Sequence, residues 1–230
     1  MIDTSNLNRT LACMQTYFLT QALGSNKRAR TRGALLDSAI SHIAEKGLDE
    51  LRISEVAVSA GLSNGTFYNH FKDKDDLALA AAEAIALEIA KGLDLQMVSL
   101  ERGASRIVVA STAFIEQALE QPEWGAVIVQ LYSRSSKSDT PALSYLRADL
   151  RLAADQQKLP LVVDQFLLEQ AGALMIAALR RQLADGRNPA LTARTCDAIL
   201  RLAGYTPTQA RREVERAAAF VSGEDHGNSV

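Results

Sequence analysis

Apolar residues recur along nearly the whole chain with the three-to-four-residue spacing of amphipathic helices. One such face, between residues 30 and 46, comprises Leu36, Ala39, Ile40 and Ile43. Alternation of apolar and polar residues over five or more positions, which would indicate a half-buried strand, is hard to find. The pattern therefore predicts an all-α protein. Further helices are expected near residues 75–95, 105–121, 122–132, 141–157, 162–184, 192–203 and 207–221, the last with a capping box at Thr206 and Gln209.

Basic residues are distributed unevenly along the chain. The formal net charge is -2 at pH 7, a value that does not by itself indicate a nucleic-acid-binding protein. Residues 26–72, however, contain seven lysines and arginines against five acidic residues, so the remainder of the chain is more acidic than the total. The distribution of charge matters more for DNA binding than its sum.

Several other classes of protein are disfavoured by what the chain lacks. Its two cysteines, Cys13 and Cys196, lie far apart in sequence, which fits a reducing cytosol better than a disulfide framework. Three histidines without a CxxC or HExxH motif predict no metal site, and no cofactor is expected. The first 24 residues do not resemble a signal peptide, and no stretch reaches 18 uninterrupted apolar residues. We therefore expect a cytoplasmic protein with no membrane segment.

Two short amphipathic helices joined by Gly61-Leu62-Ser63 predict a helix-turn-helix. The small Ala57 in the first helix allows the second helix to cross it closely. The glycine reverses the chain without strain, and the leucine packs between the two helices. Ser63 is placed to cap the second helix, whose first N–H groups are then available to a phosphate.

The second helix, expected over residues 64–71, has an inner side defined by Phe67 and Phe71. The outer side carries Gly65, Thr66, Tyr68, Asn69 and Lys72. Thr66 and Asn69 have short hydrogen-bonding side chains that are suited to base edges. The phenol of Tyr68 and the ammonium group of Lys72 are suited to phosphates. The glycine allows close approach to a duplex. The outer side therefore predicts a surface that reads the major groove.

Some nearby residues fit two interpretations. His70 lies at the margin of the inner side, where a packed, hydrogen-bonded histidine is favoured over a DNA contact. Asn64 is also marginal, and neither interpretation is preferred for it. The basic run Lys27–Arg32 precedes the first helix, and Arg28 and Arg30 are candidate contacts to phosphates or the minor groove. The alternative for this run is an ordinary solvated surface.

Four stretches, Leu35–Ala39, Ala44–Gly47, Ile53–Ala57 and Ala60–Lys74, together resemble the DNA-binding domain of the TetR/AcrR family over residues 30–89. The resemblance implies three N-terminal DNA-binding helices, a larger helical C-terminal domain, homodimerisation, and release from DNA by a small molecule. It also implies that Lys74 holds a phosphate. Asn64 departs from the family, which often has a basic or small residue there, so the operator sequence cannot be transferred.

The predicted domains are an extension with a basic arm (1–28), the helix-turn-helix domain (29–89), a regulatory and dimerisation domain (90–222) and a flexible tail (223–230). Small residues make the helix over 164–185 apolar nearly all round. The resemblance assigns this helix and the next, over 192–203, to a dimer interface; the alternative is an intramolecular core. Residues 1–24 are explained either as an extra helix or as an over-long start upstream of Met14.

The predicted function is a nucleoid-associated regulator that binds double-stranded DNA, most simply a homodimeric repressor released from an inverted-repeat operator by a mainly apolar effector. Candidate pocket residues are Phe114, Trp124, Tyr132 and Met175, although their helical spacing favours an ordinary core. Two other functions are considered. A helical enzyme lacks a nucleophile–base pair, and an interaction module without DNA binding is consistent with the acidic remainder of the chain.

Overall fold

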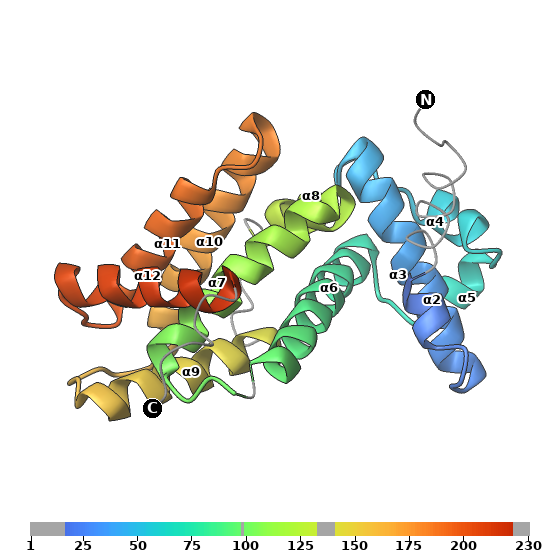
Figure 1. The fold of residues 1–230 in the computed structure, drawn as a ribbon. Coiled ribbons are helices and arrows are strands. Elements are labelled where there is room, and N and C mark those ends of the chain that lie inside the picture. The colour runs from blue at the N-terminus through green and yellow to red at the C-terminus, as the bar shows by residue number, and fades with distance from the viewer. Residues whose placement is uncertain (1–16, 98, 133–140, 223–230) are drawn as a thin grey trace. The chain divides into compact units, whose positions relative to one another are not determined.

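The computed structural model describes residues 17–97, 99–132 and 141–222, and the chain is helical without strands over these residues (Figure 1). The all-α prediction is confirmed. The helices are α2 (Tyr17–Gln21), α3 (Lys27–Lys46), α4 (Ile53–Ser59), α5 (Asn64–Tyr68), α6 (Lys74–Gln96), α7 (Gly103–Glu120), α8 (Pro122–Tyr132), α9 (Pro141–Gln157), α10 (Gln165–Asp185), α11 (Pro189–Leu202) and α12 (Pro207–Ser222). The predicted loop over 133–140, the tail from Gly223 and the first 16 residues lie outside the described ranges.

The chain divides into two compact units. The first unit contains the described residues up to Ala84 together with Ala126–Tyr132, and the second contains Ile85–Gly125 and the described residues from 141 onward. Two helices, α6 and α8, therefore each contribute to both units. The domain boundaries predicted from the sequence remain a prediction.

The first unit is built around α3, which packs against α2 and α4. Its buried side includes Leu35, Leu36, Ala39, Ile40 and Ile43, and it contributes to a core with Val56, Phe67 and Leu77. The hydroxyl of Ser38 donates a hydrogen bond to the carbonyl of Val56 over 3.0 Å, which ties α4 to α3. The helix ends at Gly47, whose φ of 83° is accessible to glycine at little cost.

A short N-terminal helix, α2, docks on α3 through one buried carboxylate. Asp37, which is 4% exposed, accepts hydrogen bonds from the backbone N–H groups of Phe18 and Leu19 over 2.9 and 2.8 Å. A Cβ atom on Gly33 would lie 2.6 Å from the carbonyl oxygen of Phe18, so glycine is required for this approach. Residues 17–21 therefore form the extra helix considered above. A start at Met14 would retain it.

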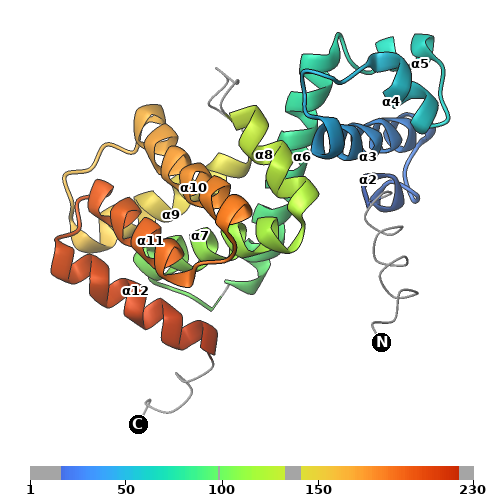
Figure 2. The ribbon, with the colours of Figure 1, turned by 90° about the horizontal axis from the view of Figure 1, so that it is seen from above.

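The second unit is organised around α7, which packs against α9, α10, α11 and α12. Both ribbon views show α10 and α11 side by side (Figures 1 and 2). The core of this unit is apolar and includes Ile107, Leu150, Leu168, Cys196, Ile199 and Leu200. Burial raises the pKa of the Cys196 thiol to about 11, so this cysteine is a protonated core residue.

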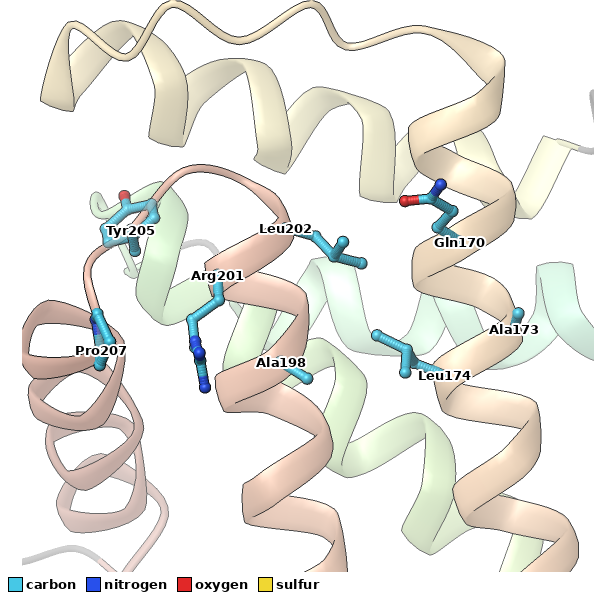
Figure 3. A pocket seen from close by; sticks show the side chains of 8 residues that line it. All are labelled: Gln170, Ala173, Leu174, Ala198, Arg201, Leu202, Tyr205 and Pro207. Atoms are coloured by element: carbon cyan, nitrogen blue, oxygen red, sulfur yellow. The ribbon is translucent and has the colours of Figure 1, made fainter.

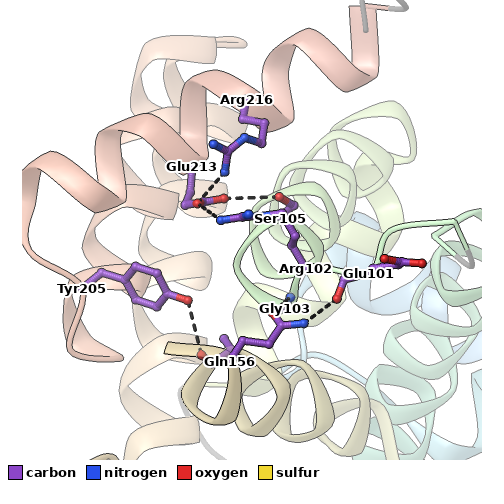
Figure 4. A network of polar contacts seen from close by, with 9 residues as sticks. Glu101, Arg102, Gly103, Ser105, Gln156, Tyr205, Glu213 and Arg216 are labelled. Atoms are coloured by element: carbon purple, nitrogen blue, oxygen red, sulfur yellow. Dashed lines mark hydrogen bonds and ion pairs between the residues drawn. The ribbon is translucent and has the colours of Figure 1, made fainter. Parts of the chain in front are cut away.

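Arginines at the start of α7 pair with buried carboxylates of neighbouring helices, and Figure 4 shows the pairing at Glu213. Glu213 of α12 accepts hydrogen bonds from Arg102 over 2.7 Å and from Arg216 over 2.6 Å. Burial of Glu213 would raise its pKa, but the hydrogen bonds and charges of these two arginines outweigh burial and hold the pKa below its usual range. The guanidinium of Arg106 pairs with Asp149 of α9 and also donates to the carbonyl of Met97 over 2.9 Å.

The start of α12 follows its predicted capping signal, whereas α11 begins earlier than predicted. At α12, the Thr206 N–H donates to the Gln209 side chain over 2.9 Å, and the Gln209 N–H donates back to the Thr206 hydroxyl over 3.4 Å, as the capping box predicts. The helix predicted over 192–203 begins earlier, at Pro189. Asn188 caps it by accepting from the Leu191 N–H, and proline is favourable at the first helical position.

Candidate nucleic-acid interface

The turn between α4 and α5 is stabilised by its own backbone. Gly61 has a φ of 69°, and the N–H of Leu62 reaches back to the carbonyl of Ala57 over 2.8 Å. Ala57 is fully buried at the helix crossing. The hydroxyl of Ser63 accepts from the N–H of Thr66 over 3.2 Å and so caps α5. Ala57, Gly61 and Ser63 therefore each have the local geometry that the sequence predicted.

The second helix of the pair ends earlier than predicted. Periodicity predicted a helix over residues 64–71, but α5 ends at Tyr68. The N–H groups of Asn69 and His70 bond to carbonyls only three residues back, over 3.2 and 2.9 Å, which tightens the last turn into 3₁₀ geometry. Because Phe71 still bonds to the carbonyl of Phe67 over 3.0 Å, the segment continues in a helical sense beyond its formal end.

Two phenylalanines anchor this segment, and its outer side is exposed. Phe67 and Phe71 are 0% and 3% exposed, with ring centroids 5.9 Å apart. The exposed residues of the segment are Ser63, Asn64, Gly65, Tyr68, Asn69 and Lys72, whereas Thr66 is half-buried. The predicted site residues from 63 to 72 are therefore accessible from outside the unit, Thr66 in part. Tyr68 is 59% exposed, which is high for a tyrosine with no role at the surface.

Gly65 has no internal reason to be glycine. A Cβ atom at this position would meet only the Ser63 hydroxyl, at 3.8 Å, which is ordinary van der Waals contact. Its φ does not lie in the left-handed region, where glycine would be required. The space that glycine leaves is therefore on the outside of the unit.

The predicted basic arm is the first turn of a helix. Sequence periodicity placed the start of the first helix near Arg30, but α3 begins at Lys27 because Asn26 caps it by accepting from the Ala29 N–H over 2.9 Å. Arg28 is exposed on this turn. Arg30 is half-buried, and its guanidinium donates to the carbonyl of Ser25 over 2.6 Å. The start of the helix therefore holds Arg28 and Arg30 on a rigid element.

His70 lies close to two arginines of α3, at the end of the α5 segment. Burial lowers the pKa of His70, and the positive charges of Arg28 and Arg32 lower it further. The guanidinium of Arg32 lies 4.6 Å from the centroid of the Phe71 ring, within the range of a cation–π interaction. His70 is half-buried, which agrees with the packed interpretation favoured by its position on the helical wheel.

Lys74, at the start of α6, makes internal contacts. Its ammonium group donates to the carbonyl oxygens of Leu48 and Asp49 over 3.4 and 3.0 Å. These contacts hold the corner between α3 and α4. The phosphate contact implied by the family resemblance remains a prediction, and it would have to be added to these two hydrogen bonds or replace one of them.

Two residues near this surface were missed by the sequence analysis. Arg32 was counted only as part of a basic run, although it follows Arg28 by four residues and shares its helix face once α3 begins at Lys27. Val58 of α4 is 76% exposed, and no local signal distinguishes it from the buried Val56 except its place on the helical wheel.

The described part of the chain holds neither a metal-ligand cluster nor a candidate membrane span. No group of three or more His, Cys, Asp or Glu side chains within these residues is arranged to hold a metal ion. No helix among residues 17–97, 99–132 and 141–222 is both long and apolar enough to cross a membrane.

Comparison with known proteins identifies the N-terminal region. A family model described as "Bacterial regulatory proteins, tetR family" matches residues 35–81, which contain α4 and α5. A Haemophilus influenzae protein described as an uncharacterized HTH-type transcriptional regulator is 33% identical over 91 residues. This match covers 39% of the chain and spans 44% of the length of that relative.

Solved structures resemble the chain over a much larger part of its length. RolR in complex with resorcinol has a TM-score of 0.62 and 26% identity, covering 83% of this chain and 95% of that chain. The regulator FadR from Bacillus subtilis, in complex with stearoyl-CoA, has a TM-score of 0.56 and covers 74% of this chain and 96% of that chain. At 15% identity, FadR shows a likeness of fold alone. The second unit therefore shares the helical architecture of such regulators.

Proposed function

Because this chain belongs to the TetR family of bacterial transcriptional regulators, we propose that it acts as a homodimeric repressor on an inverted-repeat operator and that a small, mainly apolar molecule releases it. The family consists of regulators, so the alternative of a helical enzyme is set aside. The helix-turn-helix is the DNA-binding element. Operator reading, dimerisation and effector binding by this chain are our proposals.

The observation that carries the proposal is the outer side of the α5 segment. Its polar side chains are exposed while two phenylalanines hold the opposite side in the core. Asn69 and Thr66 have the hydrogen-bonding groups that read base edges, and Tyr68 and Lys72 have groups suited to phosphates. Gly65 provides the close approach. The positive charges of Arg28 and Arg32 would supply further phosphate contacts beside this segment.

Dimerisation is supported by an uncovered face on α10 and α11. Phe166 is 65% exposed and Leu202 is 36% exposed, and the small residues Ala173 and Ala177 are exposed between them in the sequence. An open groove of about 820 Å³ lies along this face, with Ala173 and Leu174 on one wall and Ala198 and Leu202 on the other (Figure 3). Exposed apolar faces of this kind mark contact surfaces, and small residues allow close helix packing. A second copy would cover it and double the base contacts.

An apolar effector is supported by the composition of the second unit and by analogy. RolR was solved with resorcinol, and FadR with stearoyl-CoA. In this chain Trp124 is buried, and Phe114 and Met175 are half-buried. These three residues remain our candidate lining. Tyr132, which is 37% exposed and belongs to the first unit, is a weaker candidate.

The test is selection of duplexes from a random pool with the wild-type protein, Asn69→Ala and the control Gln117→Ala. Gln117 is an exposed glutamine on α7 that bonds to nearby Glu120. We expect the wild type and the control to enrich an inverted repeat. Asn69→Ala should lose about 1–3 kcal/mol on that repeat and little on random DNA. Enrichment of no sequence favours the interaction module, and an equal loss on all sequences rejects base reading by Asn69.

The oligomeric state tests the proposed dimer face. Ala173→Arg places a charged side chain in the groove, and we expect it to convert a dimer to a monomer in light scattering after gel filtration. Leu152→Glu is the matched control, because Leu152 is also an exposed apolar residue but lies on α9. A dimer that survives Ala173→Arg, or a wild-type monomer at all concentrations, places the interface elsewhere.

A further inference from the structure

The corner between α3 and α4 is held by side chains from distant parts of the chain. Leu48, which follows the helix-ending Gly47, is 2% exposed. Its N–H donates to Oε1 of Gln130 over 3.0 Å, and its carbonyl accepts from the Leu51 N–H over 3.2 Å and from Lys74 over 3.4 Å. This corner connects α3 to α4, the first helix of the helix-turn-helix. Together with the hydrogen bond from Ser38 to Val56, it positions α4.

Gln130 satisfies two backbone groups with one carboxamide. While its oxygen accepts from Leu48, its Nε2 donates to the carbonyl of Ile43 over 3.4 Å. The Ile43 carbonyl also accepts from the Gly47 N–H over 2.9 Å and belongs to the last turn of α3. One side chain thus bridges the end of the helix and the first residue beyond it. Only an amide of this length offers an acceptor and a donor side by side.

The helices that provide these side chains are the two that continue into the second unit. Gln130 lies on α8, which begins at Pro122 in the second unit, and Lys74 lies on α6, which continues past Ala84 into it. A helix transmits axial shifts and rotations of one end to the other because its backbone hydrogen bonds make it stiff. Each of the two side chains that contact the corner therefore belongs to a helix that continues into the second unit.

We propose that Gln130 is a positioning residue that couples the state of the second unit to the helix-turn-helix by clamping the α3–α4 corner. This inference rests on the proposed function, in which an effector bound in the second unit alters DNA binding. The long contact to Ile43 is at the limit of a hydrogen bond, so a shift of α8 by about 1 Å breaks it. Shifts of about 1–2 Å are the usual scale for helices in switching proteins. The corner is then free to move while the core of the first unit stays intact.

The experiment measures hydrogen exchange at the Leu48 amide in the full chain without DNA. We expect Gln130→Ala to speed exchange about 5-fold, which corresponds to the roughly 1 kcal/mol net contribution of one hydrogen bond. Gln117→Ala should leave it unchanged. Gln130→Glu should speed exchange as well, because its second carboxylate oxygen faces the Ile43 carbonyl where Nε2 donated. Unchanged exchange at Leu48 in both Gln130 variants overturns the clamp whether or not the protein binds DNA.

A double-mutant cycle tests the coupling itself. Trp124 is a buried residue of α8 within the second unit. We expect Trp124→Phe, a mild change that leaves the chain folded, to speed Leu48 exchange in the wild type but not in the Gln130→Ala background. Equal effects of Trp124→Phe in both backgrounds overturn the proposal.

DNA affinity provides the second readout. On a duplex enriched by the wild type, Gln130→Ala should bind about 5-fold more weakly, while binding to random DNA is unchanged. Faster exchange with unchanged affinity for the enriched duplex overturns the positioning role. If the wild type enriches no duplex, the proposed function fails. Hydrogen exchange at Leu48 in the double-mutant cycle then tests by itself whether Gln130 clamps the corner.

Discussion

The two units bury carboxylates in opposite ways. In the first unit, Asp37 accepts hydrogen bonds from two backbone N–H groups, and burial outweighs them, so its pKa rises from 3.8 to about 6. In the second unit, Glu213 is equally buried but lies between Arg102 and Arg216, and its pKa falls. Burial alone disfavours the charged form, and the sign of the shift is decided by whether a cation is supplied.

This difference reflects what each unit does with its cations. In the second unit, Arg102 just before α7 and Arg106 within α7 pair with buried carboxylates of α12 and α9. In the first unit, Arg28, Arg32 and Lys72 remain exposed around the α5 segment. Positive charge at the surface is available to a polyanion, whereas an arginine paired with a buried carboxylate neutralises that carboxylate inside the protein. The two units should therefore respond differently to the loss of a charge.

The largest effect is expected for Asp149→Ala in the second unit. Its partner Arg106 has a side chain only 15% exposed, so the substitution leaves a guanidinium buried without its carboxylate. Removing one member of such a pair costs about 3–5 kcal/mol. Urea unfolding followed by the fluorescence of Trp124 should show this loss. Glu213→Ala should cost less, because Arg102 and Arg216 are about half exposed and can turn to water. Equal losses at the two positions would contradict the role of arginine burial.

The elements that the sequence predicted well are those determined by neighbours along the chain. Gly61 reverses the chain where predicted, because glycine adopts a positive φ at little cost. Phe67 and Phe71 are buried together because four residues make nearly one turn. The early start of α3 was missed although its signal, the Asn26 cap, is also local. The short α5 was missed because the last turn tightens without any sequence signature.

The contacts that the sequence could not predict join distant residues to backbone groups. Gln130 and Leu48 are separated by 82 positions, and Asp37 and Phe18 by 19. A side chain that bonds to a distant backbone N–H leaves no periodicity in the sequence, because the partner can be any residue type. Lys74 illustrates the same limit. Family resemblance implied a phosphate contact, and the structure adds two carbonyl contacts that no motif encodes.

The second effect is a pH dependence of opposite sign in the two units. Between pH 3.8 and about 6, Asp37 holds a proton in the folded state that the unfolded state releases. Its contribution to stability is therefore greatest below pH 3.8 and is lost as pH rises through about 6, by roughly 3 kcal/mol at most. Glu213 has a lowered pKa, so its contribution is present above pH 4.5 and is lost as pH falls.

Hydrogen exchange of the α2 and α3 amides at several pH values, corrected for the intrinsic exchange rate, measures this effect in the first unit. We expect protection to fall from pH 5 to pH 7.5 in the wild type. Asp37→Asn cannot ionise, so its protection should stay nearly constant over the same range. Glu213→Gln is the control, since it should leave these amides unchanged and remove only the acid sensitivity of the second unit. If the protection of these amides in the wild type does not change with pH, the pKa of Asp37 is not raised.

The smallest effect on stability is expected for Lys72→Ala, and it tests whether the exposed cations of the first unit serve an external partner. The Lys72 side chain is exposed, so its loss should change the free energy of unfolding by no more than about 0.5 kcal/mol. If it contacts a phosphate, DNA binding should weaken by a similar factor on all sequences, and the slope of log affinity against log salt should fall by about 0.9. Lys46→Ala is the matched control, because Lys46 is also an exposed lysine but pairs with Glu55. A sequence-dependent loss for Lys72→Ala would instead make it a base-reading residue like Asn69, and an unchanged salt slope would remove it from the DNA surface.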